Sequence, residues 1–308
     1  MKNPGNSFVI VSPPYANNSA GIAVLHLLYK AIFTLGYNAE IIFIDNSVLP
    51  WKFYTSYNAN LYHPEASNIS INKEINLEWV HMILQNGVTI YPEIITGNPL
   101  NAKNVVRYFL NGDGVITGYK SLYEPRDFLI SFSKQYHDNP NAYLIKLVSD
   151  PHFNDTNTVV NEQRSLSLTY FGKGPKYFPC FKIKNTVVLS SEWPSNKEEL
   201  AILLKCTKYL YCWDTQSSIT SDAILCGAKV VYMQFNQLSE SEMLEHEFGV
   251  FPYLKGIIDN DNNIVIEDYP DYDVIRSVYI EKIKNIDAMW NHNVSTVIHK
   301  IFNHFKED

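Results

Sequence analysis

Short apolar runs alternate with longer segments in which apolar residues recur at helical spacing, a pattern that predicts strands separated by helices. Near the start, Ser7–Ser12 is an apolar run of strand length, and Ser19 then opens a helical segment. Gly36 supplies a stop signal before a second apolar run at Tyr37–Ile44. This order predicts a Rossmann-type βαβ unit. It lacks a G-x-G-x-x-G pattern, so a dinucleotide site is not indicated.

A second βαβ unit is predicted further along the chain. Tyr209–Trp213 is an apolar, aromatic run of strand length, followed by a polar loop at Asp214–Ser218 and a short helix at Ile219–Cys226. Gly227 is the expected left-handed residue at the end of that helix, and Lys229–Met233 is a second strand. The loop therefore follows the carboxyl end of a strand, where open α/β sheets bind phosphorylated ligands.

The remaining patterns are shorter. A Gly-Asn-Pro turn precedes a segment that we expect to be helical, Asn101–Leu110. The other expected elements are helices at Leu77–Gln85, Gln237–Phe248 and Val294–Phe305 and strands at Thr89–Tyr91, Asp127–Ser133, Ser165–Tyr170 and Thr186–Ser190.

The composition of the chain limits the possible fold, partners and location of the protein. The chain has 308 residues, of which 46% are hydrophobic and 19% charged, enough for two globular α/β domains. The net charge of −7 argues against a general nucleic-acid binder, which needs a basic face. The four cysteines form no C-x-x-C pair and indicate a reduced, cytoplasmic protein. We expect neither a signal peptide nor a membrane span, and a peripheral contact with the inner membrane stays open.

The run SSITSDAILCGAKVV resembles the donor-binding segment of GT-B glycosyltransferases, whose pattern ends in A-x-x-C-G-x-P-V-V. The resemblance implies that Ser217, Ser218 and Thr220 hold the donor diphosphate and that Asp222 holds the ribose. Asp222 stands where the family usually has Glu, and Lys229 where it usually has Pro. The alternative is a purely structural βαβ unit with a capping serine.

Two further segments of the second half fit the same resemblance. Phe171-Gly172-Lys173-Gly174 is similar to a Y-x-G-K/R-G motif in which the basic side chain meets the diphosphate, and the glycines let the backbone approach a ligand. The alternative is an exposed turn. By the same resemblance, Glu192 and Trp193 would contact the nucleobase; the alternative is simple packing.

In the first half, YPEIITGNPLNAKNVVRYFLNG resembles a segment of bacterial surface-polysaccharide glycosyltransferases. Glu93 is the best-placed carboxylate for a general base or an acceptor contact, against the alternative of a surface strand carboxylate. Asn98, Ser19 and Gly21 are candidates for the acceptor side of a cleft. His137 is a candidate catalytic residue next to the expected domain linker.

No metal site is expected. Asp271-Tyr272-Asp273 has the D-x-D spacing of GT-A enzymes, but it stands before a long helix, where Asp is a normal N-cap residue. No other His, Cys or Asp spacing resembles a metal site.

The resemblance covers most of residues 7–235 and implies an α/β fold with two Rossmann-like domains facing each other across a cleft (GT-B). The expected divisions are an acceptor domain at 1–140, a nucleotide-sugar donor domain at 141–275, and terminal helices at 276–308 packing back on the first domain. The implied function is metal-independent sugar transfer, with no cofactor, from a nucleotide sugar to a bacterial surface glycan or lipid-linked acceptor.

Two alternatives stay open. One is a catalytically inactive subunit that binds a nucleotide or sugar, and the other is a non-hydrolysing epimerase on the same fold. We expect no nucleic-acid partner. The donor base, the sugar, the acceptor, retention or inversion of configuration and the oligomeric state are left open.

Overall fold

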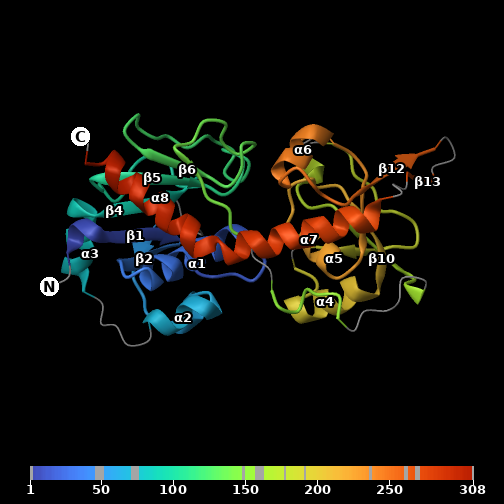
Figure 1. Cartoon of the computed structure of the whole chain (residues 1–308), viewed down its shortest axis with the longest axis horizontal. Helices are drawn as coiled ribbons and strands as arrows, with labels where there is room; N and C mark the ends of the chain where they lie inside the picture. The colour runs from blue at the N-terminus through green and yellow to red at the C-terminus, as the bar shows by residue number, and fades with distance from the viewer. Residues whose placement is uncertain are drawn as a thin grey trace. The chain divides into compact units, whose positions relative to one another are not determined.

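The computed structural model of the chain describes residues 3–45, 52–70, 76–147, 150–156, 163–176, 178–190, 192–235, 238–259, 263–267 and 271–306. The chain divides into two compact units (Figure 1). The first unit is Met1–Val148 together with Ile286–Asp308, and the second is Ser149–Asn285. The first boundary therefore lies eight residues beyond the expected one at 140/141. The second falls within a helix, α7 (Tyr272–Ala288).

The first unit is built on a seven-stranded sheet in the order β3-β2-β1-β4-β5-β6-β7. All neighbouring strands are parallel except β2 and β3. The strands are β1 (Ser7–Ser12), β2 (Asn38–Asp45), β3 (Lys52–Tyr54), β4 (Val88–Pro92), β5 (Asn104–Phe109), β6 (Phe128–Ser131) and β7 (Ala142–Tyr143).

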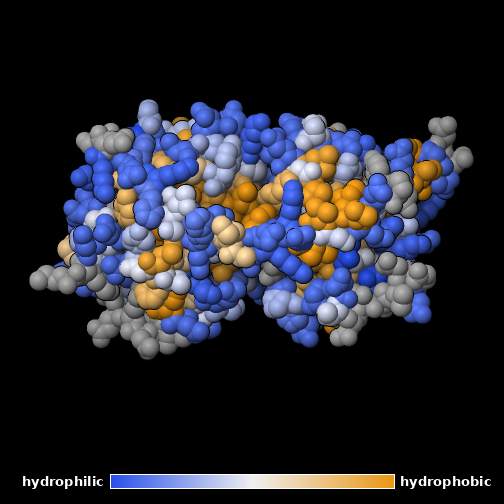
Figure 2. Space-filling model, viewed as in Figure 1, coloured by the Kyte–Doolittle hydropathy of each residue, from blue (hydrophilic) through white to orange (hydrophobic). Residues whose placement is uncertain are grey.

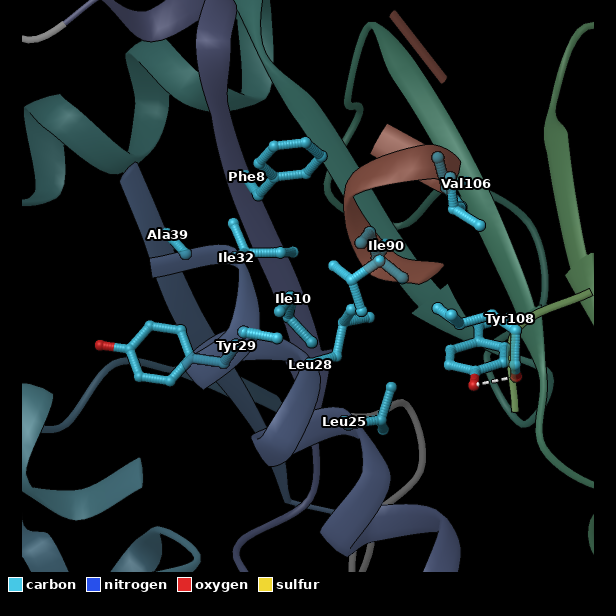
Figure 3. Close-up of a cluster of buried hydrophobic side chains, with 14 of the residues drawn as sticks. Phe8, Ile10, Leu25, Leu28, Tyr29, Ile32, Ala39, Ile90, Val106 and Tyr108 are labelled. Atoms are coloured by element: carbon cyan, nitrogen blue, oxygen red, sulfur yellow. Dashed lines mark hydrogen bonds between the residues drawn. The ribbon is translucent and has the colours of Figure 1, made fainter. Parts of the chain in front are cut away.

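Helices cover both faces of this sheet. Successive residues of β1 point to opposite faces, so Phe8 and Ile10 belong to one apolar core and Val9 and Val11 to another. The first core includes residues of α1, which Figure 3 shows, and residues of α8, and the second includes residues of α3. The helices and 3-10 turns are η1 (Pro4–Asn6), α1 (Ala20–Thr34), η2 (Ala59–Leu61), α2 (Pro64–Ser70), α3 (Leu77–Asn86) and α8 (Trp290–His304).

Helix α1 begins and ends where the sequence pattern predicts. The Ser19 hydroxyl accepts a hydrogen bond from the Ile22 amide at 3.4 Å, which satisfies one unpaired donor of the first turn. Gly36, two residues beyond the helix, has φ +87°, a conformation that favours glycine. The chain can therefore turn directly into β2.

One expected element is wrong. Asn101–Leu110 is not a helix, because Asn104–Phe109 forms β5, paired on one side with β4 and on the other with β6. The run NVVRYF is rich in β-branched and aromatic residues, which suit a central strand buried on both faces.

The second unit contains a six-stranded sheet in the order β13-β12-β11-β10-β8-β9, parallel except for the pair β12 and β13. Its strands are β8 (Leu166–Tyr170), β9 (Val187–Leu189), β10 (Thr207–Cys212), β11 (Lys229–Tyr232), β12 (Leu254–Ile258) and β13 (Ile264–Glu267). Its other elements are η4 (Gly174–Lys176), α4 (Lys197–Cys206), α5 (Ile219–Leu225), α6 (Glu240–His246) and most of α7.

The predicted βαβ unit around Gly227 is confirmed. Strands β10 and β11 are parallel neighbours, α5 connects them, and Gly227 has φ +82°. The predicted class, α/β with two Rossmann-like domains, is confirmed as well by the two parallel-dominant sheets. Hydrophilic residues cover most of the viewed face, with apolar patches between them (Figure 2).

Candidate functional site

The second sheet has a topological switch point between β8 and β10. From β8 the chain passes to β9 on one side, and it then returns through α4 to β10 on the other side. Because these strands are parallel, their carboxyl ends meet at one edge, where Tyr170 pairs with Cys212. Ligands of open α/β sheets bind outside such an edge. The residues that follow these two strands are Gly172-Lys173 and Asp214–Ser218.

The two segments are held together by Asp214, for which the sequence pattern predicts only a place in a polar loop. Its Oδ2 accepts a hydrogen bond from the Lys173 amide at 2.9 Å, and its Oδ1 accepts one from the Gln216 amide at 2.9 Å. The Lys173 ammonium donates to the Gln216 carbonyl at 3.0 Å and lies 3.8 Å from Asp214 Oδ2. The predicted diphosphate lysine thus lies against the predicted diphosphate loop.

Gly172 is required at this junction. It has φ +51°, and a Cβ there would lie 2.4 Å from Asp214 Oδ2 and 2.7 Å from a ring carbon of Tyr170. A side chain at this position would therefore force the Asp214 and Tyr170 side chains to move.

The serine and threonine candidates lie in different surroundings. Thr220 is fully buried, and its hydroxyl donates to the Ser217 carbonyl at 2.7 Å. The Ser217 side chain hydrogen-bonds the Tyr170 hydroxyl. Ser218 occupies the N-cap position of α5 without a side-chain capping bond. Ser218 therefore occupies the expected N-cap position, but its hydroxyl makes no hydrogen bond that caps the seven-residue helix.

Asp222, the predicted ribose ligand, lies in the first turn of α5. Burial raises the pKa of its carboxyl group to about 8; Lys197 opposes this shift and Asp150 adds to it. The raised pKa favours the protonated carboxyl, which can donate as well as accept a hydrogen bond.

The nucleobase candidates lie in the turn after β9. The Ser190 hydroxyl accepts hydrogen bonds from the amides of Glu192 and Trp193 at 3.2 and 3.1 Å. Trp193 is 45% exposed, which is high for a large aromatic residue. Strand β9 neighbours β8, so this turn belongs to the same edge of the sheet as Lys173.

The first sheet has an equivalent switch point between β1 and β4. From β1 the chain passes to β2 on one side and later returns to β4 on the other. Glu93 follows β4, is 6% exposed, and its Oε2 accepts a hydrogen bond from the Leu110 amide at 3.0 Å. Desolvation by burial raises the pKa of Glu93 to about 7, against the opposing effect of that hydrogen bond. Leu110 also neighbours the start of α1, since a Cβ at Gly21 would lie 3.6 Å from Leu110 Cβ.

The other candidates of the first unit have internal roles. Asn98 bonds through its amide group to the Tyr91 hydroxyl at 3.0 Å and to the Ala102 carbonyl and amide at 2.8 and 2.9 Å, which organises a turn. The ring centroid of His137 lies 4.7 Å from that of Phe109, and its Nε2 is 3.2 Å from the Tyr123 hydroxyl.

The sequence predicts that Glu93 is either a general base or a carboxylate on the surface of a strand. The structure contradicts the surface alternative, because Glu93 is buried.

Within the described ranges, no three His, Cys, Asp or Glu side chains lie together as a metal site. Asp271 precedes α7 and Asp273 lies in its first turn, which agrees with the N-terminal position expected for the D-x-D sequence. No helix in the described part of the chain has the length and apolar character needed to cross a bilayer.

The chain matches no known protein-family profile and no curated protein sequence. One solved structure that it resembles is an alpha-glucosyltransferase in complex with UDP and a 13-mer DNA containing an HMU base. The identity is 8% over 98% of this chain and 97% of the other, and the TM-score is 0.41. Another is an extracellular ligand binding receptor from Desulfohalobium retbaense DSM5692, at 12% identity over 97% of this chain and 52% of the other, with a TM-score of 0.21.

One expectation is corrected by these comparisons. The net charge of −7 led us to expect no nucleic-acid partner. The alpha-glucosyltransferase structure holds DNA together with UDP, which contradicts that expectation. Net charge averages over the whole surface and does not report a local nucleic-acid site, so the exclusion is withdrawn.

Proposed function

We propose that the protein is a GT-B-type glycosyltransferase that moves a sugar from a nucleotide-sugar donor to a bacterial surface glycan or lipid-linked acceptor, without a metal ion. The observation that carries the proposal is the junction of Lys173 with the loop after β10, at the switch point of a parallel sheet. This combination supports a diphosphate site because it offers a cation beside backbone and hydroxyl groups at the edge where such ligands bind.

The chemistry needs charge stabilisation on the donor side. The bond between the sugar and the diphosphate breaks, and negative charge develops on the leaving diphosphate. In the proposal, the Lys173 ammonium and the Ser218 hydroxyl, which makes no capping bond, donate to that charge. The exposed Trp193 ring offers a surface on which a nucleobase would stack.

On the acceptor side, Glu93 is the proposed general base for an acceptor hydroxyl. A pKa raised to about 7 suits a base that works near neutral pH, since it accepts a proton readily while remaining partly ionised. The acceptor class rests on the sequence resemblance of the Tyr91–Gly112 segment. We also propose a cytoplasmic location with peripheral contact at the membrane face; the four free cysteines favour a reducing compartment.

A second candidate is a binding subunit without catalytic activity. It is favoured by the enclosure of Glu93, whose Oε2 is already engaged by the Leu110 amide. The two functions differ in one property: an enzyme hydrolyses its nucleotide sugar slowly in the absence of acceptor, and a binding subunit releases it unchanged.

The test is a thermal-shift screen against UDP, GDP, CMP and dTDP and their sugars, repeated on Lys173→Ala. The proposal expects one nucleotide to raise the melting temperature of the parent and to have little effect on the variant. If no nucleotide shifts the well-folded parent, the donor site does not exist. The acceptor screen that follows uses glycan and lipid-linked acceptors, together with duplex DNA now that nucleic acid is no longer excluded.

A further inference from the structure

The Lys173 side chain is part of a closed ring of hydrogen bonds that joins Lys173, Asp214 and Gln216. The Lys173 amide donates to Oδ2 of Asp214, and the Gln216 amide donates to Oδ1 of the same carboxylate, each at 2.9 Å. The Gln216 carbonyl then accepts from the Lys173 ammonium at 3.0 Å. One carboxylate therefore fixes both the backbone of the lysine and the peptide group that binds its ammonium.

We propose that Asp214 is a positioning residue for Lys173, which it holds at the place where the diphosphate of the donor would lie; this inference rests on the proposed function. The Asp214 side chain is 1% exposed, so it does not itself meet a ligand in solvent, whereas Lys173 is 22% exposed. Asp214 acts on the ligand only through the lysine and the loop.

The geometry leaves the ammonium able to bind an anion. An ammonium has three donors, and among the described residues one is used by the Gln216 carbonyl at 3.0 Å. The distance of 3.8 Å to Asp214 Oδ2 is too long for a hydrogen bond, so this pair is an ion pair without a shared proton. The lysine is thus held in one orientation with donors remaining, and a ligand need not order a long flexible side chain.

The chemistry of the junction requires a carboxylate. Both of its oxygens accept hydrogen bonds from backbone amides, and a carboxylate is the side chain with two acceptor oxygens. In Asp214→Asn, the NH₂ group would face one of these amide donors, so one arm of the junction would be lost. Gly172→Ala disturbs the same junction from the other side, because its Cβ would lie 2.4 Å from Asp214 Oδ2.

The experiment is a double-mutant cycle in full-length protein, with the dissociation constants of UDP, GDP and dTDP measured by calorimetry. The four proteins are the parent, Lys173→Ala, Asp214→Asn and the double variant. We expect each single variant to weaken binding of the preferred nucleotide about tenfold. We expect the double variant to lie within about twofold of Lys173→Ala, because a residue that acts through the lysine has nothing left to position.

Two controls keep the test decisive. Asp113→Asn changes another aspartate that accepts a backbone amide, that of Ser121 at 2.8 Å in the first unit, and it should leave nucleotide binding unchanged. If Asp214→Asn does not fold, Gly172→Ala replaces it in the same cycle with the same expectation.

The outcomes separate the two proposals. The positioning role is wrong if Asp214→Asn binds nucleotide as the parent does. It is also wrong if Lys173→Ala weakens binding and the affinity of the double variant falls by the product of the two single losses. In both cases the donor site stands, provided that Lys173→Ala weakens binding. If Lys173→Ala binds all three nucleotides as the parent does, or if none binds the parent, the donor site and the positioning role both fail.

Discussion

The Leu110 amide donates a hydrogen bond to Oε2 of Glu93 across 3.0 Å, so this carboxyl group joins the segment after β4 to the segment after β5. Glu93 is nearly buried, and the bond holds in place the one carboxyl group that we propose as a base. The burial of this carboxyl group makes the stability of the first unit depend on pH.

Glu93→Gln should change the pH dependence of unfolding. Burial raises the pKa of Glu93 from 4.5 to about 7, so the native state binds a proton more tightly than the unfolded state. The contribution of the neutral carboxyl is complete below about pH 4.5 and is lost as the pH rises through about 7. The loss is at most about 3 kcal/mol. Urea unfolding of the parent and the variant at pH 5 and pH 8 measures this loss. The variant should gain stability relative to the parent between pH 5 and pH 8. A difference in unfolding free energy that is the same at both pH values would contradict the prediction.

His26 should make stability depend on pH in the acid range. Desolvation lowers its pKa from 6.5 to about 4; the hydrogen bond to the Pro13 carbonyl opposes this shift, and His63 adds to it. Since the folded pKa is depressed, the neutral ring stabilises the protein above about pH 6.5, and that contribution is lost as the pH falls toward about 4. His26→Gln should flatten the fall in unfolding free energy between pH 7 and pH 4.5. His81→Gln, on the exposed face of α3, should leave the slope unchanged.

Arg107→Ala should be strongly destabilising. The guanidinium is 1% exposed, lies 3.2 Å from Asp127, and donates to two backbone carbonyls, those of Ile95 and Gly97. Its loss leaves a buried carboxylate unpaired, at a cost of about 3–5 kcal/mol.

A matched control for this prediction is Arg126→Ala. Arg126 pairs with Glu124 at 3.1 Å, but both side chains are more than half exposed. This variant should cost less than about 1 kcal/mol because solvent screens the pair. Urea unfolding of both variants decides the matter, and equal losses would contradict the structural role of the buried pair.

Trp193→Ala should weaken nucleotide binding without destabilising the protein. Trp193 is 45% exposed, so removal of its ring should change the unfolding free energy by less than about 0.5 kcal/mol. A base stacked on it would lose roughly 1–3 kcal/mol, and we therefore expect about a tenfold rise in the dissociation constant of the preferred nucleotide. Trp193→Phe should restore most of the affinity. Unchanged binding in the alanine variant would remove Trp193 from the site.

Local signals were sufficient where an element is determined by its own residues. The Ser19 cap, the Gly36 stop and the Gly227 turn each depend on a few consecutive residues, and all three positions are confirmed. The prediction of a helix at Asn101–Leu110 is wrong because the conformation of this segment depends on strands that are distant in sequence. Most of the segment forms β5, which pairs with β4 on one side and β6 on the other.

The candidate site shows the same limit. Lys173 and the loop after β10 could be proposed from their own short motifs. The role of Asp214 could not, because its partner Lys173 is 41 residues away in sequence and an aspartate in a polar loop is ordinarily a turn or capping residue. The engagement of Glu93 by Leu110, 17 residues away, was hidden for the same reason.

The place of α8 has a consequence for the order of folding. Trp290, Val294 and Ile298 complete the core that Phe8 begins, and the Phe302 ring lies 5.5 Å from the Phe8 ring. During synthesis the core of the first unit therefore stays incomplete until residues 290–302 have left the ribosome, and by then the whole of the second unit has been translated. Early termination of translation near residue 285 would leave an open apolar face on a nearly complete domain, which is a substrate for chaperones and proteases.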